Sequence, residues 1–451
     1  MSERRRRLAR AGRLFVLVAS VIVSTQATRA QESTPARRPP LPNRANEVMP
    51  SWLRVRGEFR ERVEGVANAG FVEGRDDLYW LSRFRFNATV TPTRTFSVQM
   101  QVQDARVADK TVGATGAPFR SPFDLRMAFA DLGAPTSAVA ARIGRQELAY
   151  GDQRLVGHVS WLNAARTFDA AKITVRRKAF QMDVFGASLV RTLERSFDRS
   201  GNGQRFYGAY LTTGALVPRA SVEPYVFVKR EPSVKNETGA LATLVASTVG
   251  MRWTGRLPAR LDYNVELAAQ RGTLGSDAVA AWAAHWQLRE SYKGPHAVRL
   301  SAEVNLASGD ANPTDGRRGT FDQLYPTPHD KYGLADQIGW RNIRHVRAGV
   351  ELAPRSPWQV SASYHTWWLM NGRDALYSAG GGVVARVVTG ATSTHVGQEL
   401  DVQVTRPLTA QLSLAGGLAH IFPGGFLRQT TPAASYTAPF VMATYVFLAD
   451  K

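Results

Sequence analysis

The amino-acid sequence predicts an all-β protein, a transmembrane antiparallel β-barrel of about 18 strands. Three features predict it: an export signal, segments in which apolar and polar residues alternate with a period of two, and connections that alternate between short turns and long loops. Successive side chains of a strand point to opposite faces, so each such segment has one apolar and one polar wall. Closed into a barrel, these segments can present the apolar wall to lipid and the polar wall to a lumen.

The first segment of the chain has the form of a secretory signal. It begins with the basic stretch MSERRRRLARAGR, continues with the apolar core LFVLVASVIV, and ends in small residues before Gln31. A core of this length is too short for a membrane-spanning helix, which needs about 20 residues. We therefore predict a signal peptide over 1–30. Residues 31–50 are rich in proline and predict an extended periplasmic tether, and 51–451 are assigned to the barrel.

The alternation is clearest in LRVRGEFRERV, at 53–63, where apolar residues share one face and charged residues the other. The same pattern places Phe123, Leu125, Met127 and Phe129 on one apolar face of a later segment, opposite Arg126. Eighteen such segments can be counted, at 52–64, 78–90, 95–104, 122–132, 138–146, 167–177, 179–189, 205–215, 220–230, 243–253, 260–270, 278–289, 296–306, 339–353, 357–369, 395–406, 410–421 and 436–448. Their lengths suit tilted transmembrane strands.

The connections distinguish the two ends of the predicted barrel. Short turns such as 91–94 and 406–409 alternate with long loops such as 105–121, 307–338 and 370–394. Short periplasmic turns and long extracellular loops are typical of bacterial outer-membrane barrels. The sequence therefore predicts location in the outer membrane, in contact with its lipid.

Composition narrows the classes of partner. The formal net charge is +20, and removal of residues 1–30 would leave +14. Most of the basic residues are arginine, whose planar fork can hold a carboxylate or phosphate with two hydrogen bonds. Nucleic-acid binding is not expected, because the chain carries an export signal and alternates polar and apolar residues. Cysteine is absent, which excludes disulfides and thiolate metal sites.

One connection, LAYGDQRLVGHVSWLNAARTFD at 148–169, has neither a helical nor a strand period. It follows the fifth predicted strand, and its many apolar and aromatic residues need a surface against which to pack. The barrel interior is the nearest such surface. We therefore expect residues 147–166 to fold inward, narrow the channel and place four charged residues near the constriction: Arg145, Asp152, Arg154 and Arg166.

Several motifs, in order along the chain, resemble those of the alginate export family of outer-membrane proteins. They are RIGRQELAYGDQRLVG, WLNAARTFDAAKI, SGDANPTDGRRGTFDQLYPTPHDKYGLADQIGWRNI, GQELDVQV and GGLAHIFPGGFL. The resemblance implies an eighteen-stranded barrel whose lumen is narrowed by loops and lined with arginines and carboxylates. In the best-known member, that path carries an anionic uronate polysaccharide outward. The motifs contain Arg145, Asp152, Arg154, Arg166 and Asp169, and further along Asp310, Asp315, Asp322, His329 and Asp336.

The predicted function is an anion-selective channel for anionic saccharides or other carboxylate-bearing solutes. Arginines on a channel wall lower the barrier for anions and raise it for cations. The residues expected to line the path are Arg54, Arg56, Arg60, Arg62, Arg83, Arg85, Arg126, Arg145, Asp152, Arg154, Arg166 and Asp169. The protein is expected to be a monomer, and periplasmic or lipoprotein export partners are compatible with this function.

Three alternatives remain open at this point. The arginines could be structural, each paired with a lumenal acid. The barrel could be an enzyme, although the sequence has no G-x-S-x-G motif and its histidines are scattered. It could also be an adhesin or receptor that uses its long loops. We expect no catalytic residue, cofactor or metal; DANPTDG at 310–316 resembles a calcium loop, but Phe321 occupies the position of the required glutamate.

Overall fold

The computed structural model describes residues 44–292, 294, 297–352 and 357–448. The predicted signal peptide and residues 31–43 of the predicted tether lie outside these residues. Among the residues described, no helix is both long enough and apolar enough to cross a membrane.

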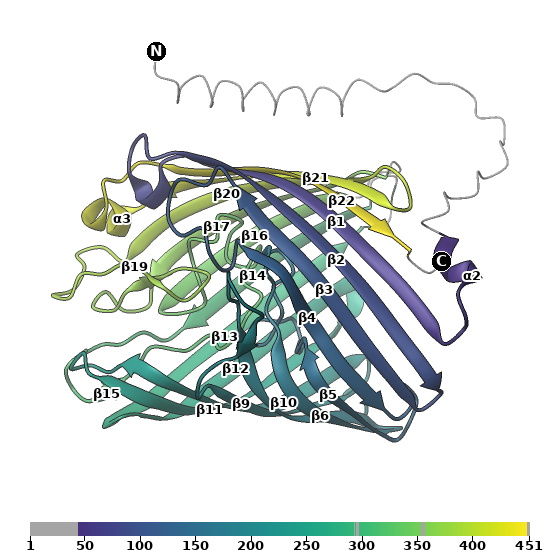
Figure 1. Cartoon of the computed structure of the whole chain (residues 1–451). Helices are drawn as coiled ribbons and strands as arrows, with labels where there is room; N and C mark the ends of the chain where they lie inside the picture. The colour runs from purple at the N-terminus through teal and green to yellow at the C-terminus, as the bar shows by residue number, and fades with distance from the viewer. Residues whose placement is uncertain (1–43, 293, 295–296, 353–356, 449–451) are drawn as a thin grey trace, which may run out of the picture.

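Eighteen long antiparallel strands form one closed barrel (Figure 1). Each strand pairs with the next long strand in the chain, and the last pairs with the first from Gly57↔Phe447 to Glu64↔Phe440. The predicted fold class is confirmed. The strands are β1 (Leu53–Val66), β2 (Asp77–Thr93), β3 (Phe96–Ala108), β4 (Ser121–Leu132), β5 (Val139–Gln146), β6 (Phe168–Arg177), β7 (Phe180–Arg191), β9 (Arg205–Thr213), β10 (Ala220–Lys235), β11 (Leu241–Arg256), β12 (Leu261–Leu274), β13 (Asp277–Ser291), β14 (Val298–Ala307), β16 (Ile343–Leu352), β17 (Gln359–Leu369), β20 (His395–Pro407), β21 (Leu412–Pro423) and β22 (Tyr436–Phe447).

Short elements lie in the connections. They are α2 (Ala45–Val48), η2 (Ala69–Phe71), β8 (Arg199–Ser200), η3 (Pro258–Arg260), β15 (Arg317–Arg318), β18 (Leu376–Tyr377), β19 (Val383–Ala385) and α3 (Gly425–Thr430). In Figure 1, α3, β15 and β19 gather at one end of the barrel, and α2 lies at the other. The end with α2 also has the short turns, such as the two residues between β6 and β7, so it is the periplasmic end.

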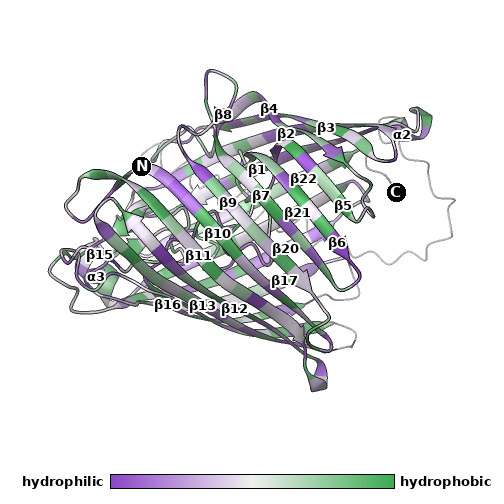
Figure 2. Ribbon diagram, turned by 90° about the horizontal axis from the view of Figure 1, so that it is seen from below, coloured by the Kyte–Doolittle hydropathy of each residue, from purple (hydrophilic) through white to green (hydrophobic). Residues whose placement is uncertain are grey.

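The two faces of the barrel wall differ as the alternation predicts. Bands of hydrophobic and hydrophilic residues alternate along the strands (Figure 2). In β1 and β2, Phe59 and Trp80 are exposed on the outside, whereas Arg60 and Arg83 are only 5% and 3% exposed on the inside. The exposed apolar side chains form the surface that faces lipid.

One strand departs from the expected alternation. The register between β3 and β4 shifts at Arg126, which is left as an extra residue in β4. Such a bulge moves the following side chains to the opposite face. Met127 and Phe129 are buried, and the guanidinium of Arg142 lies 4.0 Å from the ring centre of Phe129. The prediction that both share the outer face with Phe123 is therefore wrong.

The end of the predicted tether is also different from the expectation. Residues 45–48 form the helix α2 instead of an extended segment. The side-chain amide of Asn46 donates to the carbonyl oxygens of Val55 (2.7 Å) and Leu448 (2.6 Å) and accepts from the Val55 amide (2.9 Å). α2 therefore joins the start of β1 to the end of β22 at the periplasmic end of the barrel seam.

Candidate functional site

Two long loops fold into the barrel. We call them the β5–β6 loop (147–167) and the β14–β16 loop (308–342). They pair with each other in the lumen: the Tyr325 amide donates to the Leu155 carbonyl, and the Gly157 amide donates to the Tyr325 carbonyl, each at 2.8 Å. The inward folding predicted for 147–166 is confirmed.

An aromatic wall explains why the loops stay inside. The inner faces of β6, β7, β9 and β10 carry rings that form one buried cluster with apolar residues of both loops: Phe168, Phe185, Phe206, Phe227, Leu148, Leu155 and Tyr325. Burial of each large apolar side chain contributes about 1.5–3 kcal/mol. This aromatic wall is not among the features predicted from the sequence. The sequence does contain an indication of the wall, because β7, β9 and β10 carry apolar residues on both faces. A barrel strand with an apolar inner face needs something inside the barrel to pack against.

Three arginines of β1 and β2 hold the β5–β6 loop by its backbone. We call Arg60, Arg62 and Arg83 the arginine clamp. Arg60 donates to the carbonyl oxygens of residues 160 and 161, each at 3.0 Å. Arg62 donates to the carbonyl oxygen of residue 161 at 2.7 Å. Arg83 donates to the carbonyl oxygens of residues 160 (2.9 Å) and 162 (3.0 Å). The loop is therefore fixed to the wall by hydrogen bonds from charged donors, which are stronger than neutral ones.

The side chain of Trp161 lies at the centre of the clamp. The Arg62 guanidinium lies 3.8 Å from its ring centre, and the His329 ring stacks on it at 3.9 Å with an angle of 8°. The edge of Phe440 meets the same ring. Trp161 therefore connects the barrel wall to both loops.

Positive charge exceeds negative charge on this wall. Arg62 pairs with Glu64 (2.7 Å), Arg83 with Glu58 (2.5 Å) and Arg126 with Glu147. Arg60 and Arg85 are equally buried but form no ion pair with a described residue; Arg60 donates only to carbonyls, and Arg85 to the Gln103 side chain at 2.8 Å. On this wall, Arg60 and Arg85 thus have no carboxylate partner among the residues described.

Cavities lie on both sides of the clamp along β1. On the periplasmic side, a cavity of about 350 Å³ is lined by Arg54, Arg56, Glu58 and Arg85. On the extracellular side, a cavity of about 370 Å³ is lined by residues that include Arg62, Asp77, Lys110 and Trp161. The clamp and the backbone that it holds form the partition between them.

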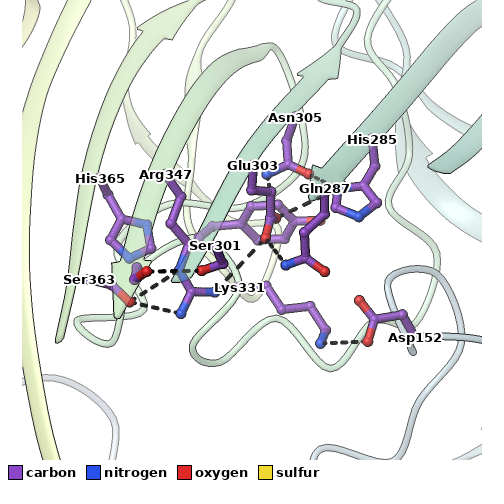
Figure 3. A network of polar contacts seen from close by, with 12 residues as sticks. Asp152, His285, Gln287, Ser301, Glu303, Asn305, Lys331, Arg347, Ser363 and His365 are labelled. Carbon is purple, nitrogen blue, oxygen red and sulfur yellow. Dashed lines mark hydrogen bonds and ion pairs between the residues drawn. The ribbon is translucent and has the colours of Figure 1, made fainter. Parts of the chain in front are cut away.

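The opposite wall carries a buried polar network that includes Glu303, Asn305 and His285 (Figure 3), and Arg154 of the β5–β6 loop joins it. Arg154 forms an ion pair with Glu303 (2.9 Å) and donates to Asn305 (3.2 Å). Burial lowers the pKa of Arg154, but the Glu303 carboxylate outweighs burial and the net shift is upward. Glu303 also accepts from Gln287 at 2.8 Å. Arg154 is therefore a charged anchor of the loop.

The network continues around the wall as a chain of contacts between inward residues of β13, β14, β16, β17 and β20. Its members are His285, Asn305, His345, His365, Asp401 and Glu399. The carboxylates at its end accept the amides of Leu334 (3.1 Å) and Ala335 (3.0 Å) in the β14–β16 loop. One polar belt therefore anchors both inward loops. Below the belt, a cavity of about 770 Å³ opens at the periplasmic end, with Arg347 in its lining.

The remaining motif residues of the loops have structural partners. Arg166 donates to the carbonyls of Gly157 and Pro326, each at 2.9 Å, and burial lowers its pKa to about 10. Asp322 pairs with Lys229 at 2.9 Å. Asp152 pairs with Arg154 at 3.2 Å. Asp310 and Asp315 cap backbone amides of their own loop at 3.1 and 2.9 Å.

Arg145 and Asp169 do not belong to the lumen, contrary to the prediction. They pair with each other at 2.8 Å in neighbouring strands. Arg145 alternates with Ile143 on the outer face, and Asp169 with Ile173; both isoleucines are more than half exposed. The inward positions beside them are filled by Gln146 and Phe168, so the Arg145–Asp169 pair lies on the outside of the barrel. Among the described residues, no group of three or more histidines and carboxylates could hold a metal ion.

A closed eighteen-stranded barrel with an apolar outer face and loops folded into a polar lumen defines a porin-like channel of the bacterial outer membrane. The sequence matches the family model described as alginate export over residues 51–440, and the chain belongs to that family. No curated protein matches the sequence.

Solved structures of outer-membrane porins share the fold. OccK11 (OpdR) of Pseudomonas aeruginosa is 14% identical, with a TM-score of 0.57 over 87% of this chain and 96% of its own. OccAB2 of Acinetobacter baumannii is 11% identical, with a TM-score of 0.58 over 88% and 98%. OccK2 (OpdF) of Pseudomonas aeruginosa, solved in complex with glucuronate, is 10% identical, with a TM-score of 0.58 over 88% and 96%.

Proposed function

We propose that this outer-membrane channel is anion-selective and passes carboxylate-bearing solutes, anionic saccharides among them. The observation that carries the proposal is the charge of the partition. Arg85 lines the periplasmic cavity, and Arg60 lies on β1 between the linings of the two cavities; neither has a carboxylate partner among the described residues. An uncompensated guanidinium attracts anions into the channel and repels cations.

The chemistry of the clamp supports carboxylates as the permeating groups. Arg60 donates to neutral carbonyl oxygens, which are weaker acceptors than a carboxylate. An anion in the periplasmic cavity meets Arg85, which lines that cavity and donates to the neutral side-chain oxygen of Gln103. The bound glucuronate of OccK2 and the description of the family are consistent with an acidic sugar as solute.

Catalysis is not part of the proposed function. Two histidine–aspartate pairs resemble part of a catalytic arrangement: His329 with Asp336 at 2.9 Å, and His365 with Asp401 at 3.1 Å. The ring of His329 is stacked on that of Trp161. His365 is fully buried, and its second ring nitrogen lies 3.0 Å from His345. A general base must reach a substrate proton. The ring nitrogens of His365 contact only Asp401 and His345 of the buried polar belt.

Liposome swelling tests the proposal with three solutes of similar size and different charge. Glucuronate should enter proteoliposomes faster than neutral glucose, and protonated glucosamine should enter slowest. The R60Q/R85Q variant should reduce the difference between glucuronate and glucosamine. Equal entry of the anion and the cation would contradict the proposed selectivity.

A further inference from the structure

Four arginines gather at the extracellular rim of the barrel. Arg191 of β7 lies opposite Arg199 of β8, and Arg205 of β9 lies opposite Arg230 of β10. All four are exposed. None of them forms an ion pair with a described residue, unlike most arginines of the lumen. Four like charges at adjacent positions repel one another, and an anion bound between them would relieve this repulsion.

The cluster surrounds a cavity. A space of about 550 Å³ is lined by Arg191, Arg199 and Arg205 together with the turn at 200–203, and no carboxylate is part of the lining. Arg230 braces the turn from behind by donating to the Gly203 carbonyl at 2.9 Å. Gly203 has a φ of 73°, which favours glycine, so the turn can curve closely around the cavity.

Several acids near the cavity have other partners. Asp198, directly before Arg199, accepts from the Leu193 amide at 2.7 Å. Asp169 accepts from the Ser200 hydroxyl and is paired with Arg145. Glu231 pairs with Lys229 at 2.7 Å. Among the described residues, the lining of the cavity therefore contains three arginines and no carboxylate, while Glu194 and Asp198 lie elsewhere in the same loop.

The cavity lies directly above the lipid-facing surface. Tyr207, two residues after Arg205, is 48% exposed, and Val226, four residues before Arg230, is 39% exposed, on the same outer side of their strands. In the loop between β7 and β8, Phe197 is 65% exposed. Apolar exposed side chains below and basic side chains above are the arrangement that suits a lipid with an anionic headgroup.

We propose that this rim cavity binds the phosphate of a phosphorylated glycolipid headgroup in the outer leaflet. The guanidinium forks of Arg191, Arg199 and Arg205 hold the phosphate oxygens with paired hydrogen bonds, the preferred geometry between arginine and phosphate. The acyl chains lie along the outer face near Tyr207. The site is independent of the lumen and of its selectivity.

Binding of defined lipids to the purified, folded protein tests the site. Native mass spectrometry in detergent compares diphosphoryl lipid A, the same lipid without phosphates, and inorganic phosphate as a competitor. Wild-type protein should bind the diphosphoryl lipid at least about tenfold more tightly than the dephosphorylated one, and the R191Q/R199Q/R205Q variant should lose that preference. Equal affinity for the two lipids, or an unchanged preference in the variant, would overturn the proposal.

Two controls keep the result interpretable. The R94Q/R177Q/R219Q variant removes three exposed arginines at the periplasmic end and should bind like the wild type. The R191K/R199K/R205K variant keeps the charge but loses the fork, so an intermediate affinity is expected, and this variant serves if the glutamine variant does not fold. Displacement of the lipid by inorganic phosphate at comparable concentration would identify a site for soluble anions and overturn the assignment to lipid.

Discussion

At the scale of single residues, Arg60 and Arg85 differ from Arg62, Arg83 and Arg126 by having no carboxylate partner among the described residues. A unit charge about 4 Å from a permeating ion in water-like surroundings is worth about 1 kcal/mol, or about a fivefold effect. R60Q and R85Q should therefore each lower the anion-to-cation permeability ratio about fivefold in planar bilayers. R256Q is the matched control, because Arg256 pairs with Asp262 and is 71% exposed, so its charge is screened. An equal loss in R256Q would mean that overall charge, and not the partition, sets the selectivity.

The contact between Trp161 and His329 should depend on pH. Burial lowers the pKa of His329, but the Asp336 carboxylate, 2.9 Å away, outweighs burial and raises the pKa above its ordinary value. A raised folded-state pKa means that the stabilisation is fully present below about pH 6.5 and is lost as the pH rises through the raised value. Arg62 and Asp330 also face this ring.

Single-channel recordings at increasing pH measure this loss as more frequent fluctuations of conductance, because the loops then separate more often. The D336N variant should move the transition to lower pH, and H329Q should remove it. A pH profile in H329Q identical to that of the wild type would assign the fluctuations to another group.

At the scale of elements, the β5–β6 loop is the partition of the channel. Deletion of Gly151–Ser160 should raise the conductance, because it removes Leu155 and the Ser160 carbonyl, which accepts from Arg60 and Arg83, while β5 and β6 keep their register. Heat-modifiable migration on gels shows whether the barrel is still assembled. Unchanged conductance of an assembled barrel would exclude the loop from the path.

Arg154 and Arg145 provide a matched pair of substitutions, one inside and one outside the barrel. R154Q leaves Glu303 buried without its guanidinium, and breaking a buried ion pair costs about 3–5 kcal/mol. The loop should detach, and the conductance should rise or fluctuate. R145Q should leave the conductance unchanged. An effect of R145Q on conductance would place that side chain on the path after all.

The elements also show how far the sequence alone could predict the structure. All eighteen long strands and the inward β5–β6 loop follow from periodicity and from apolar content. The start of the strand predicted at 339–353 is wrong, because β16 begins at Ile343. Trp340 before it is fully buried in the lumen and donates to the Leu306 carbonyl at 3.0 Å. A local period cannot distinguish a strand from a loop that is buried by distant residues.

The candidate site could be predicted only in part, because its side chains also contact residues that are distant in the sequence. The alternation in β1 and β2 places Arg60, Arg62 and Arg83 inside, but their acceptors are carbonyls about a hundred residues away in the chain. The residue types do not show which backbone carbonyls accept these hydrogen bonds. The bulge at Arg126 and the outward direction of Arg145 depend on the pairing register, which is set by neighbouring strands.

At the scale of the whole molecule, the protein should behave as a monomeric β-barrel. Circular dichroism of the refolded protein should show β-structure almost alone, and the protein should migrate differently on gels with and without heating. A helical fraction of about one third, the average of soluble proteins, would be incompatible with a chain whose described helices are only a few residues long.

The reversal potential in a KCl gradient across a planar bilayer tests the central claim most directly. At low salt, wild-type protein should show a reversal potential of the sign that indicates preference for chloride over potassium, because the uncompensated lumenal arginines dominate the local field. The preference should weaken as the salt concentration approaches 1 M, where the screening length is about 3 Å. A preference for potassium at low salt would contradict the account of an anion-selective lumen.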